Sequence, residues 1–551
     1  MKIEPIANGK GRSPFDRFST VDLEWYPETL ELRLVGVYDG RDYRAYTSIE
    51  HFLRRELSGR NRTFFAHYGG MADIVFFLRP LADDGWSVEA IFSGSSAIIV
   101  TVKRDGKTHT FIDSFWTLRG SLRSLGAAIG INKLDCAFDA PIAELTEYNY
   151  YDCLILFKAL CMYRDEMEAA GVSPGYTLAS TAMKLFRTVY LEDEIRIPRS
   201  LNDELRHHYI GGRVEVFNRK PGLSGGYFDI NSSYPYSMTK PLPGSYLRCD
   251  RNMSECCFID GTFRVKDCRE GALPVKYKAG LAYPTGLIRG VFYIAEVMQG
   301  LSANTLEIEK IAGVYHFEPQ TYMRKYALEF YGRRRETTDP FKRLLYKLLM
   351  NSLYGKFGEK RVKEQILINP ITLDGESVKR EIRSGIVAVE REVNVPHENL
   401  AIAGAITAQS RATLYSYIAG SGLYYCDTDS AAVPSHVNYG DSSELGAMKK
   451  EFSFDYGHFV LPKLYRVDKV VKAKGFPRAD ITGFEHIVSG GKFRHERFRR
   501  VRGVLKTGLA PFSDHGVKQM RDPALKRYYF PDGDSRPYTV DEAQSALGVM
   551  T

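Results

Sequence analysis

Hydrophobic and polar positions repeat with two different periods along the chain, which predicts a protein built from both strands and helices. The apolar runs at residues 32–38 and 227–230 have the length and the aromatic or β-branched content that strands favour. Residues 347–355 repeat at helical spacing instead, and their polar positions occupy a face that a core helix would fill with apolar side chains. The chain is therefore expected to be a multidomain protein of the α/β and α+β classes.

Two carboxylates stand two positions apart at Asp427 and Asp429, shortly after the apolar residues 422–424. Residues two apart on a strand point to the same face, so both side chains can enter one cleft as hard oxygen ligands for divalent cations. A solvated hairpin turn or a calcium-binding loop is the simpler interpretation of so short a motif. A calcium loop counted from Asp427 needs Gly at its sixth position and Glu at its twelfth, whereas the chain has Ala432 and Asn438 there.

Partner residues for this pair lie earlier in the chain, in a definite order. Asp229 follows an aromatic strand and leads into a Ser-Tyr-Pro turn. The helix of residues 347–355 places Lys347, Asn351 and Tyr354 on one face, because they lie at i, i+4 and i+7. A carboxylate strand, a cationic helix and a carboxylate hairpin in this order resemble motifs A, B and C of the family B DNA polymerases.

Two shorter motifs narrow the resemblance to the protein-primed branch of that family. Tyr209, Gly211 and Gly212 form an element that looks like the Tyr-x-Gly-Gly link between exonuclease and polymerase parts. Lys463 and Tyr465 match the Lys-x-Tyr motif downstream of motif C. The gaps from motif A to motif B and from motif B to motif C are 118 and 72 positions, more than a short connection needs. In that branch such gaps hold two insertions, of which one contacts a terminal protein and the other encircles DNA.

The resemblance implies that these residues carry out two-metal synthesis of DNA. Asp229 and Asp427 are expected to hold two Mg²⁺ ions, with Mn²⁺ as the alternative. The backbone carbonyl of Ile230 is expected to complete one coordination shell, and Asp429 to be a supporting acid near the metals. Lys347 is expected to neutralise charge on the incoming triphosphate.

The same resemblance implies how the sugar and the base are selected. Tyr234 matches the motif A tyrosine that packs under the deoxyribose and leaves no room for a 2′-hydroxyl, so the product should be DNA. A core tyrosine before a proline turn would explain the segment in isolation, but it fits poorly within this set of motifs. The residues expected to contact substrates are Tyr209, Gly211, Gly212, Ser232, Tyr234, Lys342, Arg343, Asn351, Tyr354, Lys463 and Tyr465.

A second set of acids lies in the N-terminal third of the chain. Asp22 and Glu24 stand at i and i+2 on a strand-like segment, and Asp73 follows a short strand at the head of an apolar run. Tyr148 and Asp152 lie one turn apart at the opening of an amphipathic helix. These residues resemble the Exo I, Exo II and Exo III motifs of a 3′–5′ proofreading exonuclease, in which Asp22, Glu24 and Asp152 would be metal ligands.

Two further positions bear on the expected exonuclease. Lys133 falls where the protein-primed family carries a catalytic lysine, although a lone surface lysine is the ordinary alternative. Tyr68 stands where the family's second exonuclease motif has an Asn that holds the frayed primer strand. A phenol can stack on a base but lacks the paired donor and acceptor of a carboxamide. We therefore expect an active exonuclease with altered strand transfer or substrate preference.

Charge and cysteine content agree with a nucleic-acid enzyme. The 551 residues are 44% hydrophobic and carry a net charge of only +8, but residues 461–530 hold 17 Lys or Arg against 6 Asp or Glu. A basic region with interleaved aromatics suits a phosphate backbone, while a solvated basic surface is the plainer alternative. Eight cysteines without a Cys-x-x-Cys pair are typical of a reduced, cytosolic protein. No apolar run reaches the length of about 18 residues that a membrane span needs, so a cytoplasmic protein without membrane contact is expected.

The expected architecture is an RNase-H-like exonuclease domain followed by a right-hand polymerase with two insertions. The segments are an exonuclease domain (15–170), a connector (171–213), a first palm part (214–247), a first insertion for the terminal protein (248–337), the fingers (338–357), a second insertion with a strand-displacement hairpin (358–400), a second palm part (401–480) and a thumb (481–551). Gly375 and the alternating residues 386–389 mark the hairpin of the second insertion.

The expected partners of this chain, which should act as a monomer, are primer-template DNA, deoxynucleoside triphosphates, a terminal protein as primer and a single-stranded DNA-binding protein. One alternative is a family B polymerase that extends ordinary nucleic-acid primers. Another is a non-catalytic relic that only binds nucleic acid. A relic is expected to lack acids from the motifs, and none of them is missing.

Overall fold

Ten strands from two distant parts of the chain form one sheet of the computed structural model, which describes residues 1–7, 13–59, 61–372, 378–476, 479–520 and 526–550. The order of this N-terminal sheet is β19-β20-β18-β6-β7-β8-β5-β2-β3-β4, and β5 runs parallel to both β2 and β8. Its first part consists of β2 (Ser19–Trp25), β3 (Leu32–Tyr38), β4 (Tyr43–Tyr46), β5 (Arg62–Ala66), β6 (Ser87–Ser93), β7 (Ser96–Arg104) and β8 (Lys107–Asp113). The strand expected at residues 32–38 is thereby confirmed.

Helices cover both faces of the N-terminal sheet, because alternate residues of its strands are buried on opposite sides. Phe64 packs with the core that includes α2 (Ile74–Asp83), whereas Phe65 packs with the core that includes α4 (Ile142–Ala169). Helix α4 begins at Ile142, six residues before Tyr148, where the amphipathic pattern predicted its start. The other helices of this part are α1 (Ile49–Glu56) and α3 (Leu122–Ala128).

The residues expected to form the second insertion extend the N-terminal sheet. β18 (Val362–Ile368) pairs antiparallel with both β6 and β20 (Ile386–Glu392), and β19 (Val378–Arg383) pairs with β20 at the edge. Paired strands therefore occur where residues 386–389 predicted a hairpin, while Gly375 lies outside the described residues. The sheet joins segments that stand almost three hundred positions apart in the sequence.

A second large sheet, called the palm sheet here, has the order β10-β21-β22-β11-β23-β24-β25. Its strands are β10 (Val214–Val216), β11 (Leu223–Ile230), β21 (Tyr425–Asp427), β22 (Ser430–Pro434), β23 (Met448–Leu461), β24 (Leu464–Val467) and β25 (Val470–Ala473). Helix α12 (Leu400–Ile418) begins at Asn399, whose side chain accepts from Ile402 N–H, and its alanine-rich sequence is buried against this sheet. The palm sheet thus unites the two palm segments expected from the sequence.

The segment expected to form the fingers belongs to a hairpin of two helices, α9 (Tyr322–Glu336) and α10 (Pro340–Ser352). Asp339 caps α10 by accepting from two backbone N–H groups, and Pro340 follows at the first helical position, where its missing N–H costs nothing. Helix α10 ends at Ser352, and a short turn, α11 (Tyr354–Phe357), follows it. The first helix of the hairpin therefore lies in the range that was expected to belong to the first insertion.

The first insertion is built on a four-stranded antiparallel sheet of order β12-β17-β13-β16. Its elements are β12 (Leu242–Asp250), β13 (Cys257–Val265), β14 (Val275–Tyr277), β15 (Gly280–Ala282), β16 (Gly286–Tyr293), α8 (Ile294–Ser302) and β17 (Leu306–Gln320). The connector that precedes the palm comprises α5 (Leu178–Leu185), the π-helical turn η2 (Phe186–Tyr190), β9 (Ile195–Arg196), which pairs with β1 (Lys2–Ile3), and α6 (Arg199–His208).

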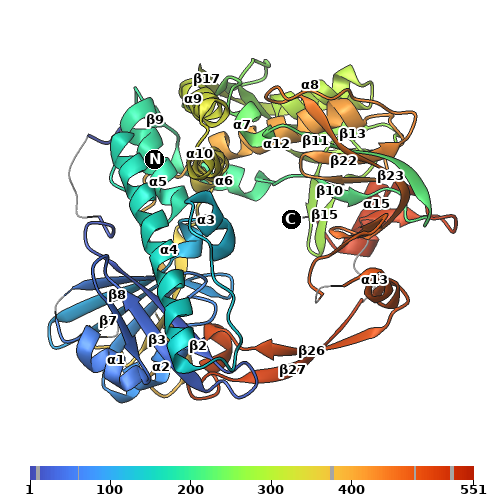
Figure 1. Cartoon of the computed structure of the whole chain (residues 1–551). Coiled ribbons are helices and arrows are strands. Elements are labelled where there is room, and N and C mark those ends of the chain that lie inside the picture. Colours follow the sequence, from blue (N-terminus) through green and yellow to red (C-terminus); the bar gives the residue numbers. More distant parts are fainter. Residues whose placement is uncertain (8–12, 60, 373–377, 477–478, 521–525, 551) are drawn as a thin grey trace.

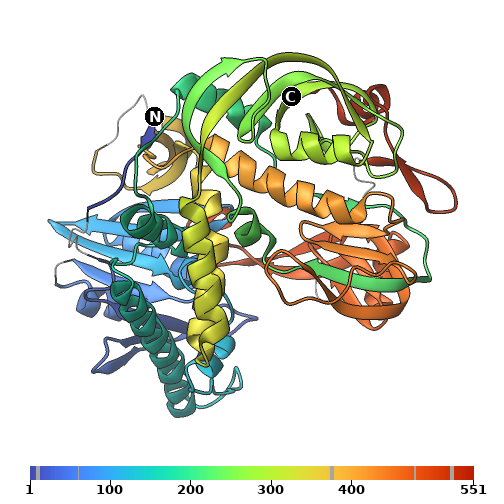
Figure 2. The ribbon, with the colours of Figure 1, turned by 90° about the horizontal axis from the view of Figure 1, so that it is seen from above.

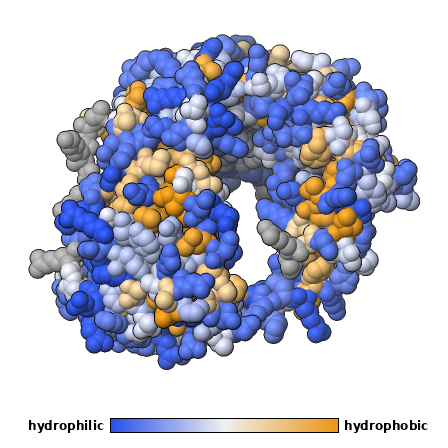
Figure 3. Space-filling view, viewed as in Figure 1, coloured by the Kyte–Doolittle hydropathy of each residue, from blue (hydrophilic) through white to orange (hydrophobic). Residues whose placement is uncertain are grey.

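The β-hairpin of the expected thumb closes the molecule into a ring (Figures 1 and 3). It comprises α13 (Ile481–Val488), β26 (Lys492–Phe498), α14 (Val501–Val504) and β27 (Ser513–Gln519). At its tip, the ring of Phe498 lies 6.1 Å from that of Trp25 on β2, and Val501 and Val504 are buried in the core of the N-terminal sheet. Figure 3 shows the opening that this contact encloses.

Residues 526–550 do not pack with the β26–β27 hairpin of the expected thumb. β28 (Arg527–Tyr529), β29 (Ser535–Pro537) and α15 (Val540–Leu547) return to the palm sheet and the first insertion, where Thr285 and Asn218 form isolated bridges with this segment. The expected thumb at 481–551 therefore divides into a hairpin that reaches the N-terminal sheet and a segment that packs elsewhere. Within the described ranges, none of the helices combines the length and the apolar character that a membrane crossing requires.

Candidate active sites

Three carboxylates meet at one end of the palm sheet. Asp229 is the last residue but one of β11 and Asp427 the last of β21, and both have Ser430 on the intervening strand β22 as their Cα partner. Asp429 lies in the tight turn that joins β21 to β22. The backbone N–H of Ile230 donates to the carbonyl of Asp429 at 2.7 Å, so the strand of motif A holds the turn of motif C directly.

The three acids differ in their charge partners and in their pKa values. Lys463 Nζ lies 2.7 Å from Asp427 Oδ2, so the charge of Asp427 is paired. Burial, followed by the charge of Asp229, raises the pKa of Asp429 to about 7. Burial, followed by the charge of Glu451, raises the pKa of Asp229 to about 6. The sequence-based prediction made Asp427 the metal ligand and Asp429 its support; in the structure Asp427 has a lysine beside it, whereas Asp429 has the raised pKa.

Glu451 is a residue of this site that the sequence did not reveal. It lies on β23, two positions after Lys449, which is the Cα partner of Asp229. Lys449 Nζ is 3.0 Å from Glu451 Oε1, and both side chains share the face of the sheet that carries Asp229. No motif marks Glu451, because only the pairing of β23 with β11 brings it to the metal-ligand candidates.

The Lys-x-Tyr motif lines a groove beside Asp427. The backbone N–H of Lys463 donates to the hydroxyl of Tyr425 at 3.1 Å, and the rings of Tyr425 and Tyr465 lie 5.3 Å apart. The groove has a volume of about 490 Å³, and its lining includes Asp427, Lys463, Tyr465, Lys472, Lys474 and Phe476. Three lysines and two aromatic rings next to a carboxylate form a surface that fits a nucleic-acid strand at a metal site.

The two tyrosines expected to select the nucleotide stack on each other. The rings of Tyr234 and Tyr354 lie 4.2 Å apart. Lys347 and Asn351 are exposed on α10, on the turns that precede Tyr354. The structure therefore brings motif A and motif B together through this aromatic pair, with a cation and a carboxamide beside it.

The other two cations expected to meet the triphosphate have partners in the structure. Lys342 Nζ lies 2.8 Å from a carboxylate oxygen of Glu166 on α4, and the hydroxyl of Tyr346 donates to the same side chain. Arg343 donates to the carbonyl of Thr337 at 3.1 Å. Figure 2 shows the fingers helices beside the long α4. The fingers are thus tied to the helix that carries Asp152 in the N-terminal site.

The Tyr-x-Gly-Gly element rests on a buried arginine that the sequence did not reveal. Arg411 of α12 donates to the carbonyl of Gly211 at 2.7 Å and forms a two-fold ion pair with Glu296 at 2.7 Å. A Cβ atom at Gly212 would lie 2.6 Å from Thr428 Cγ2, so only glycine allows the element to approach the turn between Asp427 and Asp429 this closely.

Tyr209, the first residue of this element, and Ser232 are two further expected substrate contacts, and each lies at the end of a helix. Tyr209 is the C-terminal cap of α6, and its ring lies against Gly358. Ser232 adopts a left-handed conformation with a φ of 51° directly before α7 (Ser233–Ser237).

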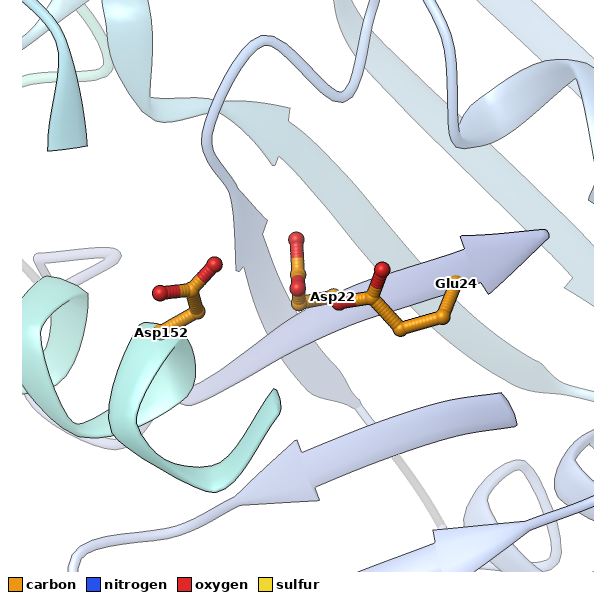
Figure 4. Close-up of side chains that lie close together, drawn as sticks. All are labelled: Asp22, Glu24 and Asp152. Carbon is orange, nitrogen blue, oxygen red and sulfur yellow. The ribbon is translucent and has the colours of Figure 1, made fainter. Parts of the chain in front are cut away.

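The acids of the N-terminal third form a tighter group than those of the palm. Asp22 and Glu24 lie on β2, and Asp152 faces them from α4 (Figure 4). Across the ranges that the structure describes, these three are the one set of acidic, His or Cys side chains whose ligand atoms all lie within 4.8 Å of one another. Burial, followed by the charge of Glu24, raises the pKa of Asp22 well above its usual range. Hard oxygen atoms gathered this closely suit a divalent cation.

Lys133 and Tyr148 join this group. Lys133 Nζ donates to the hydroxyl of Tyr148 at 2.8 Å and to the carboxylate of Asp152. The ammonium group also lies 4.2 Å from the centre of the Tyr148 ring. Lys133 is therefore no ordinary surface lysine in this structure.

Asn149 is the residue of the N-terminal site that the sequence analysis missed. Its Nδ2 donates to Asp22 Oδ2 at 3.0 Å and to Glu24 Oε1 at 3.3 Å, while its Oδ1 accepts from the hydroxyl of Tyr43 at 3.0 Å. A signal was available, because a polar residue three positions before Asp152 occupies the same face of α4.

Asp73 is as buried as Asp152 and has a second acid near it. Burial, followed by the charges of Glu24 and Asp113, raises the pKa of Asp73 well above its usual range. Asp113 is itself buried at the end of β8, and its pKa is raised to about 6 mainly by that burial. Asp113 escaped prediction because no motif marks it.

Tyr68 belongs to an aromatic platform at the edge of this site. It has a φ of 59°, its side chain is 37% exposed, and its ring stacks on Phe115 at 4.5 Å. The guanidinium group of Arg119 covers Phe115 at 4.6 Å. A stacked, exposed ring with a cation nearby can receive a nucleobase, in agreement with the stacking role expected for a phenol here.

The chain is similar to known proteins along most of its length. The sequence family described as DNA polymerase type B, organellar and viral, matches residues 139–438, which is more than half of the chain. The DNA-directed DNA polymerase of Enterobacteria phage PRD1 is 26% identical over 459 residues, covering 78% of this chain and 78% of that protein. The DNA polymerase of Streptococcus phage Cp-1 is 23% identical over 539 residues, covering 84% and 90%.

The fold is also similar to that of a solved polymerase. Phi29 DNA polymerase complexed with primer-template DNA and incoming nucleotide substrates superposes with a TM-score of 0.72. The superposition covers 92% of this chain and 100% of that one at 16% sequence identity. At this identity the likeness establishes a shared fold, which agrees with the multidomain α/β and α+β class expected from the sequence.

Proposed function

Because the chain belongs to the type B DNA polymerases of organelles and viruses, we propose that it replicates a viral or plasmid genome by two-metal nucleotidyl transfer at the palm site. The observation that supports this most directly is the meeting of Asp229, Asp427 and Asp429 at one end of the palm sheet. A groove with three lysines and two aromatic rings opens beside them. The substrates would be primer-template DNA and deoxynucleoside triphosphates.

The palm acids fit a pair of divalent cations. Asp229 and Asp429 offer hard oxygen ligands whose pKa values are raised mainly by burial and further by neighbouring carboxylates, and the carbonyl of Ile230 adjoins them. Bound Mg²⁺, or Mn²⁺ as the alternative, would lower the pKa of the primer 3′-hydroxyl and stabilise the leaving pyrophosphate. Asp427, which is paired with Lys463, would then support the site from the side of the groove.

The nucleotide would be held by residues of the fingers and the palm. Lys347 would neutralise charge on the triphosphate, and Asn351 would line the nascent base pair. Tyr234 and Tyr354 fill the space between the two parts in this structure, so they must separate for a base pair to enter. Closure of α10 around a correct pair would then complete the site.

The N-terminal site would remove misincorporated nucleotides as a 3′–5′ exonuclease. Asp22, Glu24 and Asp152 would hold the metal ions, and Lys133 would balance the charge of Asp152. Tyr68 would stack on the base of the frayed strand, where the related enzymes use a carboxamide.

Protein priming and strand displacement belong to the same proposal. The first insertion offers a separate four-stranded sheet beside the palm, where a terminal protein could dock and present its hydroxyl as the primer. The ring closed by the β26–β27 hairpin would retain DNA during long synthesis and displacement of the non-template strand. A single-stranded DNA-binding protein would protect the displaced strand. The cytoplasm of a host cell is the proposed site of action, and all eight cysteines are unpaired in the structure.

A primer-extension and degradation assay tests the two active sites separately. Asp429→Asn should reduce Mg²⁺-dependent extension on the order of 10²–10³-fold and leave degradation of the primer intact. Asp22→Asn should do the reverse, so each variant is the control for the other. Asp427→Asn should lose less extension than Asp429→Asn if the charges assign the metal ligand correctly. Absence of Mg²⁺-dependent extension by the wild type would remove the proposal.

Priming is tested by incubating the protein with a labelled deoxynucleoside triphosphate and the product of any small gene for a basic protein that neighbours its own gene. Covalent labelling of that protein is the expected result. Extension of ordinary primers without such labelling would support the alternative of a polymerase that uses nucleic-acid primers.

A further inference from the structure

The last described residues, 526–550, form a segment that we call the C-terminal brace. It packs behind the palm sheet, on the side of the first insertion (Figure 1). The backbone N–H of Arg219 donates to the carbonyl of Gly533 at 2.7 Å, and Asn218 forms a bridge with Asp534. The brace therefore contacts the chain directly after β10, the strand at one edge of the palm sheet.

Side chains of the brace donate hydrogen bonds to backbone carbonyl groups along this edge. Tyr529 donates to the carbonyl of Val216 at 2.7 Å, and Ser535 donates to the carbonyl of Phe217 at 2.6 Å. Lys526 Nζ lies 3.2 Å from the carbonyl of Val214. An edge strand has unpaired backbone groups, and these contacts satisfy two carbonyl groups of β10 and that of the residue after it without adding a strand.

Arg527 enters the interior behind the edge strand. Its side chain is 1% exposed, its Nε donates to Ser535 at 2.9 Å, and its guanidinium group lies 4.3 Å from the centre of the Phe217 ring. Arg527 Nη1 lies 3.6 Å from Glu215 Oε1, and neither of these two buried atoms has a hydrogen-bond partner. Glu215 also pairs with Arg213 at 2.6 Å, so two buried cations converge on one carboxylate.

Residues 213–215 connect this buried cluster to the catalytic turn. Val214 and Glu215 are the Cα partners of Asp427 and Cys426 on β21. The carbonyl of Arg213 accepts from the backbone N–H of Thr428 at 2.6 Å, in the turn between the two motif C acids. A shift of Glu215 would therefore move the turn that carries Asp427 and Asp429.

We propose that Arg527 is a positioning residue for nucleotidyl transfer, and that the C-terminal brace sets the geometry of the motif C turn through Glu215 and Arg213. Arg527 touches neither substrate nor the acids. It holds Glu215 in place, because a buried carboxylate left with fewer cations would rearrange its neighbours. The inference rests on the proposed synthesis of DNA at the palm site.

The test compares three single variants of the whole chain with the wild type: Arg527→Met, Arg527→Lys and the matched control Arg536→Met. Arg536 lies in the same brace, but it pairs with Glu542 near the surface. For each variant, kcat and KM for the deoxynucleoside triphosphate are measured in primer extension. Degradation of a single strand by the N-terminal site is measured in the same preparation, and the wild-type extension rate reports separately on the proposed function.

Arg527→Met is expected to lower kcat of extension at least about tenfold, because a misplacement of about 1 Å can cost on the order of 10²-fold. The KM for the nucleotide should stay within about twofold, and degradation should be unchanged, since Lys347 and the N-terminal acids are untouched. Arg527→Lys should recover part of kcat, because it keeps the charge but not the planar fork. Arg536→Met should match the wild type.

Two results would overturn the inference. One is a wild-type kcat of extension in Arg527→Met. The other is an equal loss of extension and degradation together with a lower melting temperature, which would show that the brace only holds the fold.

Discussion

Single buried carboxylates govern the behaviour of both sites in the absence of cations. Asp73 is 5% exposed, and burial together with the charges of Glu24 and Asp113 raises its pKa well above the usual range. In the folded protein the charged form is therefore disfavoured, whereas in the unfolded chain it is solvated. Each such acid weakens the metal-free fold at neutral pH, and this cost is offset when a cation binds.

Asp73→Asn should stabilise the protein in the presence of EDTA. The folded pKa is raised, so the penalty is absent below the unfolded pKa and complete once the pH exceeds the folded pKa. At pH 8 we expect a rise in Tm of about 2–4 °C, the shift that about 1 kcal/mol produces in a domain of about 150–250 residues. The gain should shrink as the pH falls toward the unfolded pKa, because the folded acid is then protonated and its penalty disappears. A lower Tm of the variant at pH 8 would contradict this account.

Tyr234→Val should admit ribonucleotides. The ring stacks on Tyr354 at the proposed nucleotide site, and its removal leaves room for a 2′-hydroxyl. Steric discrimination of this size is worth about 1–3 kcal/mol, so the preference for deoxyribonucleotides should fall about 10–200-fold in kcat/KM. Tyr236→Val, whose ring lies against Gly446 instead, is the matched control. Unchanged discrimination in Tyr234→Val would remove the assignment.

One helix organises the N-terminal site. Helix α4 supplies Tyr148, Asn149 and Asp152 within little more than one turn, so their relative positions follow from helical geometry. Its later residue Glu166 pairs with Lys342 of the fingers. Helix α4 thus carries one acid of the N-terminal site and also contacts helix α10 near the palm site.

Asn149→Ala should slow degradation about 10–100-fold, the usual cost of losing a group that orients metal ligands. Its carboxamide nitrogen donates to Asp22 and Glu24, while its oxygen accepts from the hydroxyl of Tyr43. Extension at the palm site should be unchanged, which excludes a general loss of fold. Glu147→Gln, at an exposed neighbouring position, is the control. Equal degradation by both variants would mean that Asn149 does not orient the acids.

The ring is a property of the whole molecule. It closes where the ring of Phe498 lies 6.1 Å from that of Trp25, the residue that follows Glu24 in β2, and 6.2 Å from that of Phe76. A fully buried Phe contributes about 3–5 kcal/mol, and a half-buried one roughly half as much. Phe498 is thus one contributor to this contact, beside the buried Val501 and Val504.

Phe498→Ala should shorten the products made in a single binding event. A loss of about 2 kcal/mol shifts the ratio of closed to open rings on the order of 10-fold or more toward the open state. The rate of single-nucleotide addition should not change, because the palm site is distant from the tip. Val517→Ala, at an exposed position of the same hairpin, is the control. Product lengths equal to those of the wild type in the presence of a DNA trap would show that the contact does not retain DNA.

The sequence by itself determined the local elements of this protein and the residues of its motifs. The strands around Asp22 and Asp229 and the helix of Lys347 followed from short-range periodicity and spacing, which depend on neighbours a few positions away, and the acids of both sites followed from the resemblance of their motifs to a known family. Only the tertiary structure decided which acids stand free and which are paired. Asp427 is paired because Lys463 folds back onto it, Asn149 matters because α4 crosses β2, and residues 526–550 pack behind the palm sheet. Strand pairing and burial between distant segments create these differences, and neither has a signature in the local pattern of the chain.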